Sequence, residues 1–278
     1  MAQVDGAITD FGMAIGPLTM GDLADNDIGY LVRTSQKLTD PNQRQPANMR
    51  YSSLSDELVT RYNRVGQKAK KGWYDYTTTT TTTNNKNKKL IPQPSTQVSQ
   101  LIQHHCLVKN AMVLPCSSTV QLHKEEIVER LLFPLVNEGF KVLQEAVARH
   151  PHDIDIIYIY GYGWPAWRGG PMYWADYQIG LPHILKKLQQ WSQQCQDHNL
   201  DCPHLIPSPL LQQCISQNLT IHDYYNKHQP NKSNNNSKKP SSNCNSSTCT
   251  NHCAILETER FSYFHDKYAY ISRQLKLR

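Results

Sequence analysis

The chain has 278 residues, with 29 lysines and arginines against 23 aspartates and glutamates, so its formal net charge is +6. This length allows one or two domains. Seven of the lysines lie in two polar tracts, at 77–89 and 227–252, and subtracting them from +6 leaves −1 for the rest of the chain. The tracts contain none of the interleaved aromatic residues that a nucleic-acid-binding face needs, so we expect no nucleic-acid partner.

The N-terminal 29 residues contain a pattern that recurs at residues 154–180. In the first copy, Asp5 is followed by mostly apolar positions, by glycine, by the pair Gly16-Pro17 and then by Asp22. Glycine supplies the positive φ that ends a helix, and proline fits the first turn of the next helix. Each copy therefore predicts a helix, a glycine stop and a helix started by proline. The repetition indicates a duplicated structural unit.

A long amphipathic segment, 124–149, precedes the second copy, whereas only three residues precede the first. Its apolar residues are spaced so that they follow one face of a helix. They are Ile127, Leu131, Leu132, Leu135, Val136, Phe140, Leu143, Ala146 and Val147. Because the first copy has no equivalent helix, we expect its repeat to be truncated and this stripe to be uncovered. An uncovered stripe would offer a docking face to a partner or to a second copy of the chain.

Other segments complete the predicted order of domains. Residues 1–76 form the truncated first repeat, and residues 77–119 form a low-complexity linker that begins with seven threonines. Residues 120–226 form the second repeat, including helices at 181–194 and 207–225. Residues 227–253 are rich in Asn, Ser and Lys and are expected to be disordered, since they have little apolar surface to bury. An amphipathic pattern at 254–278 makes that segment a candidate helix.

Three blocks carry a resemblance to a known family. They are Asp10 to Gly29, Asn63 to Tyr76 and Tyr160 to Tyr173. In this order and with these gaps they resemble the C-terminal helical domain of 3-hydroxyacyl-CoA dehydrogenases, most closely that of the peroxisomal bifunctional enzymes of fatty acid β-oxidation. The resemblance implies an all-α fold with a duplicated helical repeat, of the 6-phosphogluconate dehydrogenase C-terminal type, here with a truncated first repeat and disordered inserts.

The chain also departs from the family pattern. Ala14 stands where the family has proline, Asn63 stands where it has glycine, and Ala69-Lys70 replaces a Thr-Gly pair. The resemblance implies an upstream Rossmann-type domain that holds NAD and a His–Glu catalytic pair, and this chain contains neither. We therefore assign no catalytic, cofactor-binding or metal-binding residue, and we expect NAD only in the complete enzyme.

Several residue groups suggest sites and have plainer interpretations. The glycines of Gly161–Ala166 mimic a dinucleotide fingerprint, but Trp164-Pro165 would block a pyrophosphate, so we interpret the run 154–160 as a helix and the glycines as its stop. Late cysteines and histidines have spacings that a zinc site tolerates. Because the residues around them are mainly Asn and Ser and offer no apolar core, we expect unstructured thiols instead. These cysteines and histidines are Cys244, Cys249, His252, Cys253 and His265. The cluster His104-His105-Cys106 has no sequence partners.

Two further groups of residues have two possible interpretations each, a ligand contact or a structural role. The aromatic residues Trp164, Trp167, Tyr173 and Trp174 with Arg168 could contact an acyl chain, or could pack in the core or between domains. Arg64, Lys68 and Lys71 could meet a CoA phosphate, or could be solvated loop charges.

The sequence thus predicts the C-terminal helical region of a 3-hydroxyacyl-CoA dehydrogenase, inactive alone, with a non-catalytic helical interaction module as the alternative. In the complete enzyme, 3-hydroxyacyl-CoA is oxidised to 3-oxoacyl-CoA with NAD. The partner would be a Rossmann-type cofactor domain, and acyl-CoA would be a substrate only of the complete enzyme. The chain shows no run of 18 apolar residues and no secretory signal. Resemblance places it in the peroxisome, although its end, Lys276-Leu277-Arg278, lacks the Ser-Lys-Leu signal, and its own features otherwise indicate the cytoplasm.

Overall fold

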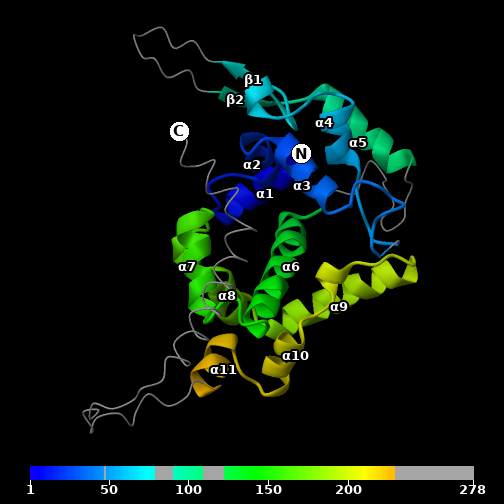
Figure 1. Cartoon of the computed structure of the whole chain (residues 1–278). Helices are drawn as coiled ribbons and strands as arrows, with labels where there is room; N and C mark the ends of the chain where they lie inside the picture. The colour runs from blue at the N-terminus through cyan, green and yellow to red at the C-terminus, as the bar shows by residue number, and fades with distance from the viewer. Residues whose placement is uncertain (47, 79–89, 109–121, 229–278) are drawn as a thin grey trace, which may run out of the picture. The chain divides into compact units, whose positions relative to one another are not determined.

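The computed structural model describes residues 1–46, 48–78, 90–108 and 122–228 (Figure 1). Residues 1–227 form one compact unit. Most of the predicted polar tract at 227–253, the late cysteines and histidines, and the candidate helix at 254–278 lie outside the described residues.

The described residues of the N-terminal half form five helices, a 3-10 turn and a hairpin. They are α1 (Ala2–Phe11), α2 (Pro17–Leu23), α3 (Asn26–Ser35), α4 (Leu54–Thr60), η1 (Gln67–Ala69), β1 (Tyr74–Thr78), β2 (Leu90–Pro94) and α5 (Thr96–Val108). The two strands are antiparallel, with Tyr74 opposite Pro94 and Thr78 opposite Leu90. This hairpin is the one sheet among the described residues, so the all-α fold class is confirmed.

The described part of the C-terminal half contains helices joined by loops and no strand element. Its elements are α6 (Lys124–Gln144), α7 (Pro151–Gly161), η2 (Ala166–Arg168), α8 (Pro171–Trp174), the π-helical turn η3 (Ala175–Ile179), α9 (Leu181–Asp197), η4 (Pro203–Leu205), α10 (Pro209–Ser216) and α11 (Ile221–His228). In the described parts of the chain, no helix is long and apolar enough to cross a membrane.

Both copies of the repeated pattern fold as predicted. Helix α1 ends at Gly12, which has φ 114°, and α2 begins at Pro17. In the second copy the run rich in β-branched residues is helical, as predicted, and forms α7; Gly163 follows it with φ 70°. Proline then starts α8 at Pro171. The local helix signals at the ends therefore outweigh the poor helix propensity of the middle.

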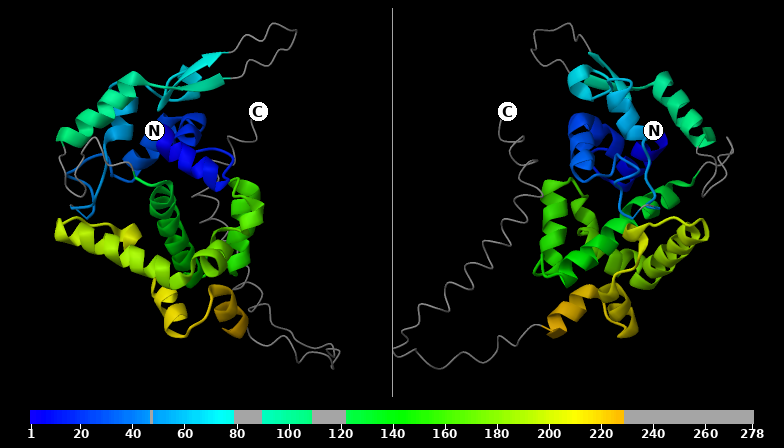
Figure 2. Two further views of the ribbon diagram at one scale, coloured as in Figure 1. Left: turned by 180° about the vertical axis from the view of Figure 1, so that it is seen from behind. Right: turned by 45° about the vertical axis from the view of Figure 1, so that its right-hand side comes forward.

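The expectation that the apolar stripe of 127–147 is uncovered is wrong. Helix α6 lies between α1 and the group formed by α8, α9 and α10 (Figure 2). Its side chains Phe133, Val136 and Phe140 are completely buried. The stripe also ends earlier than predicted, because α6 stops at Gln144, and Leu131 within it is partly exposed. Helices of the same repeat, together with α1, supply the cover that the sequence seemed to lack.

Part of the segment 77–119, which the sequence predicts as a low-complexity linker, has regular structure, because it contains β2 and α5. Val98 and Leu101 of α5 are buried against Leu58 of α4. The sequence suggested a linker because the threonine tract and the following Asn and Lys residues dominate its composition. Residues 79–89 and 109–119 of the predicted linker lie outside the described residues, and the boundaries of the two repeats stay a prediction.

The two halves are also joined away from α6. The backbone of residues 48–50 pairs with the segment that follows α9: Asp201 N donates to Asn48 O at 3.0 Å, and Arg50 N donates to Asp201 O at 2.9 Å. Met49 and Asp201 form a parallel bridge there. The first half is therefore also held to the second at a place remote from α6.

Because Phe140 lies at the centre of this core, Phe140→Ala should lower the free energy of unfolding by about 4 kcal/mol, through lost burial and the cavity left behind. Urea denaturation of the purified chain measures this value. The matched variant is Leu131→Ala on the same helix, where the side chain is 39% exposed, and it should cost less than about 1 kcal/mol. Equal losses for the two variants would contradict the burial of α6.

Candidate functional site

One buried aspartate in each repeat binds the start of the helix that begins with proline. Asp5 of α1 accepts hydrogen bonds from the backbone N–H groups of Leu18 and Thr19, at 2.8 and 3.0 Å. Asp155 of α7 accepts them from Met172 and Tyr173, at 2.7 and 3.4 Å. A carboxylate at a helix N-terminus satisfies N–H groups that have no partner within the helix. The first aspartate of the pattern therefore fixes the angle between successive helices in both copies.

The second aspartate of the pattern binds a more distant segment. Asp22 is completely buried and accepts hydrogen bonds from the N–H groups of Trp73 and Tyr74 at 2.7 and 3.0 Å, which holds the start of β1. It also accepts from Tyr76 Oη at 3.0 Å and Asn26 Nδ2 at 2.8 Å. Sequence reasoning placed this aspartate in the pattern but gave it no role, although its position five residues after proline in both copies was a usable signal.

In the second copy, Asp176 binds the start of α11 and, with it, a histidine. It accepts hydrogen bonds from Ile221 N and His222 N, at 3.1 and 3.3 Å. Its Oδ2 also lies 2.6 Å from His222 Nδ1. Burial alone would lower the pKa of His222, but the carboxylates of Asp155 and Asp176 outweigh it and raise the pKa to about 9. His222 was missed in the sequence because its partners come from other helices.

The glycine turns of the two copies meet where α1 ends. A Cβ atom on Gly12 would lie 3.0 Å from Pro165, and one on Gly163 would lie 3.2 Å from Ala14 Cβ. Arg168 Nε donates to Phe11 O at 2.9 Å. Ala14, where the family has proline, donates its N–H to Gly163 O at 3.4 Å, a contact that proline could not make.

The aromatic residues of the second block divide between two environments. Trp164 and Trp174 are buried, and their rings lie 5.2 and 5.4 Å from the ring of Phe11. Trp167 is 70% exposed and Tyr173 is partly exposed. The packing interpretation therefore holds for Trp164 and Trp174, which join the two repeats, while the contact of Trp167 and Tyr173 with a ligand stays a hypothesis.

The glycines of Gly161–Ala166 do not fit NAD. A dinucleotide fingerprint needs a strand that leads into a helix whose N–H groups face the pyrophosphate. Here the preceding segment is α7, and Pro165 packs against Gly12. The interpretation of these glycines as a helix stop is consistent with this structure.

The three basic residues of the second block do not form one site. Arg64 is buried and donates to Gly72 O at 2.6 Å and to Asp75 Oδ1 at 2.7 Å, so it holds β1 in place. Lys68 is exposed and forms an ion pair with Asp27 at 2.6 Å. Lys71 takes part in the same loop through its backbone, which bridges to Gly66 and Asp75. The structure thus gives Arg64 and Lys68 structural partners in place of a CoA phosphate.

Two departures from the family pattern fall where the backbone is left-handed. Asn63 has φ 49° and Lys70 has φ 55°. Glycine adopts this region freely and asparagine tolerates it, but lysine does so at a cost. This explains why the family has glycine at both positions.

The histidines at 104–105 belong to α5, and His105 Nδ1 lies 3.8 Å from Glu57 Oε1 of α4. This pair connects α4 and α5 beside their small core. The side chain of Cys106 lies outside the described part of the structure.

Four apolar side chains of the adjacent helices α2 and α3 are exposed, and we call this group the α2–α3 face. It consists of Met20, Leu23, Leu31 and Val32. Met20 lies three residues after Pro17 and is 40% exposed, whereas Trp174 lies three residues after Pro171 and is 3% exposed. The ring of Trp174 packs against Phe133 of α6, at 6.0 Å between centroids. The α2–α3 face therefore includes the position that α6 covers in the second repeat.

Comparisons with known proteins agree with this architecture. A family model described as 3-hydroxyacyl-CoA dehydrogenase, C-terminal domain, matches residues 1–76 and 127–220. The peroxisomal bifunctional enzyme of Cavia porcellus is 36% identical over 226 residues, which is 77% of this chain and 28% of that protein. The peroxisomal fatty acid beta-oxidation multifunctional protein AIM1 of Arabidopsis thaliana is 30% identical over 191 residues, covering 69% of this chain and 24% of that protein.

A solved structure also matches. It is the dehydrogenase part of multifunctional enzyme 1 from C. elegans, with a TM-score of 0.53 and 25% sequence identity over 77% of this chain and 41% of that chain. This chain therefore spans 28% or less of the length of the two curated relatives described.

Because Lys70 occupies a left-handed conformation, Lys70→Gly should raise the free energy of unfolding by about 0.5–1 kcal/mol, the strain removed being larger than the added chain entropy. Urea denaturation measures the change. The control is Ala69→Gly in the neighbouring 3-10 turn, which should destabilise by about 0.5–1 kcal/mol. A loss of stability in Lys70→Gly as large as in the control would contradict the assigned strain.

Because four donors converge on Asp22, Asp22→Asn should cost about 3 kcal/mol, since the amide keeps the shape but loses the charge and turns a donor toward other donors. The same denaturation measurement tests it. Asp10→Asn serves as the comparison, because Asp10 is exposed and pairs only at the surface with Lys124, so its effect should stay below about 1 kcal/mol.

Proposed function

The chain belongs to the family of 3-hydroxyacyl-CoA dehydrogenase C-terminal domains, and from that membership we propose that it is the helical part of a β-oxidation dehydrogenase whose cofactor site lies on another domain. The observation that carries the proposal is the family match across both repeats, residues 1–76 and 127–220. The buried aspartates Asp5 and Asp155, which set the helix angles, lie within the matched residues. The complete enzyme would oxidise 3-hydroxyacyl-CoA to 3-oxoacyl-CoA with NAD.

The chain alone is inactive in this proposal. The glycine turn after α7 does not fit NAD, and Arg64 and Lys68 are occupied by carboxylates and a carbonyl rather than arranged around a phosphate. A separate Rossmann-type domain would supply the cofactor and the catalytic pair. The names of the relatives in animals and plants support a peroxisomal location.

The α2–α3 face is the proposed contact with the rest of the enzyme. Burying apolar surface contributes about 25 cal/mol per Å², so four partly exposed apolar side chains on adjacent helices favour a covered state. Helix α6 covers the equivalent position in the second repeat through Phe133 and Trp174. By analogy, the contact would be an amphipathic helix that belongs to the cofactor-binding polypeptide.

The alternative is a non-catalytic helical module that binds a partner. The sequence supported this alternative through an uncovered stripe on α6, but Val136 and Phe140 of that stripe are completely buried. The α2–α3 face would serve this alternative equally well, so activity must decide between the two functions.

The test is to measure acetoacetyl-CoA-dependent NADH oxidation by the purified chain, alone and mixed with the NAD-binding part of a related peroxisomal bifunctional enzyme. We expect no turnover alone and turnover in the mixture, because only the mixture contains the cofactor site and the helical cover together. Turnover by the chain alone would contradict the proposal that it is inactive alone.

A matched pair of variants tests the docking face. Leu31→Glu places a charge on the α2–α3 face, where Leu31 is 58% exposed, and should abolish turnover in the mixture. Tyr160→Glu places the same charge on α7, where Tyr160 is 86% exposed, and should leave turnover unchanged. If the unmodified chain binds the NAD-binding part without restoring turnover, the non-catalytic module gains support.

A further inference from the structure

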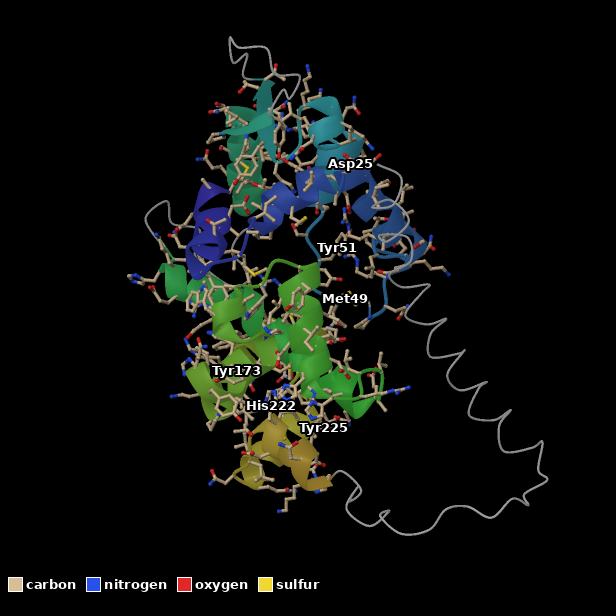
Figure 3. All side chains as sticks on the ribbon, turned by 90° about the vertical axis from the view of Figure 1, so that its left-hand side faces the viewer. Asp25, Met49, Tyr51, Tyr173, His222 and Tyr225 are labelled. Carbon is tan, nitrogen blue, oxygen red and sulfur yellow. The ribbon has the colours of Figure 1, made fainter. Side chains whose placement is uncertain are left out.

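A histidine–aspartate cluster lies where the N-terminal turns of α7, α8 and α11 meet. His152 is in the first turn of α7, Asp155 follows on the same helix, and His222 is in the first turn of α11. One ligand atom from each of the three residues lies within 4.8 Å of the others. Asp155 and His222 are buried and His152 is exposed, so the cluster opens to solvent on one side. Figure 3 labels His222 together with Tyr173, whose ring centroid lies 6.3 Å from that of the histidine.

Two atoms of this cluster are buried without a hydrogen bond. Asp155 uses Oδ1 to bind the start of α8, which leaves Oδ2, and His222 uses Nδ1 to bind Asp176, which leaves Nε2. Both residues are 4% exposed. The two atoms lie 3.5 Å apart, longer than the roughly 2.9 Å of an ordinary N–H···O bond. The two atoms face one another as an ion pair at a distance too long for a good hydrogen bond, and a bound metal ion would contact both of them directly.

The distance between these atoms suits a tetrahedral metal ion. Zinc binds histidine nitrogen and carboxylate oxygen at about 2.1 Å, so two ligand atoms in a tetrahedral site are about 3.4 Å apart. The separation of 3.5 Å between Asp155 Oδ2 and His222 Nε2 matches that edge. The ring of His152 lies 4.5 Å from the ring of His222, at an interplanar angle of 41°, close enough to supply a third ligand with a small rotation.

The surroundings also have the arrangement of a metal site. Asp176 Oδ2 lies 2.6 Å from His222 Nδ1, and a carboxylate on the far nitrogen of a ligating histidine fixes its tautomer and raises its basicity. Asp155 and Asp176 bring two carboxylates into a buried region beside His222, and a divalent cation bound to the neutral imidazole would balance both.

We propose that His152, Asp155 and His222 form a zinc site, with Asp176 as the supporting residue and the fourth position open to water. The site does not depend on the proposed dehydrogenase function, because it rests on the geometry of His152, Asp155, His222 and Asp176 alone. Its occupant would join α7 to α11 and stabilise the end of the second repeat.

The experiment titrates zinc into the full chain by isothermal calorimetry, in a background where Cys244, Cys249 and Cys253 are changed to serine so that late thiols do not compete. We expect one zinc per chain and a thermal unfolding midpoint that rises with zinc. His152→Gln should weaken zinc binding at least about tenfold while leaving the metal-free midpoint unchanged, because this histidine is exposed.

His222→Gln should abolish binding, and Asp176→Asn should weaken it by roughly 10–100-fold. The control is His198→Gln, an exposed histidine after α9, which should bind zinc like the parent chain. Equal zinc affinity in the parent and in His152→Gln, or no saturable binding by the parent, would overturn the proposal and leave a structural ion pair only. The readout by His152→Gln does not depend on whether the buried variants fold.

Discussion

Buried carboxylates that collect backbone N–H groups are the interactions on which the rest of this structure depends. Asp5 and Asp155 each bind the first N–H groups of a short helix, and Asp22 and Asp176 each bind the start of a distant segment. Hydrogen bonds to a charged acceptor are about twice as strong as neutral ones, and each carboxylate makes at least two. Helices as short as α2 and α8 are not stable on propensity alone, so their direction comes from these side chains.

The second aspartate binds a different element in each of the two repeats. In the first repeat, the second aspartate holds a β-hairpin, and α2 and α3 keep an apolar face toward solvent. In the second repeat the second aspartate, Asp176, holds α11. There α6 covers the position that is exposed in the first repeat. A duplicated frame has therefore produced one half whose apolar side is covered and one half whose apolar side chains on α2 and α3 are exposed.

The sequence was sufficient for the local structure and insufficient for the contacts. Gly12, Pro17 and Pro171 mark helix ends through φ restrictions of single residues, so α1, α2 and α8 could be predicted from them. The elements that cover α6 could not be predicted in this way. Their residues Phe11, Trp174 and Leu188 come from three separate elements, and the periodicity of a sequence does not show which other helix a residue contacts.

The same reason explains what was missed. Among the described side chains of α5, the apolar ones that are firmly buried are Val98 and Leu101, and a tract of threonines beside them dominates the composition. The cluster of Asp155 and His222 joins residues far apart in the chain through tertiary folding, whereas the sequence placed its metal candidates among the late cysteines.

The contact between the two glycine turns has an evolutionary consequence. Gly12 lies against Pro165, and Gly163 lies against Ala14, so each turn forms part of the steric boundary of the other. A bulkier residue in one turn is then acceptable only if the opposite turn recedes, and the two mutations should be strongly epistatic. Replacements in the two turns should therefore occur in pairs among relatives of this domain.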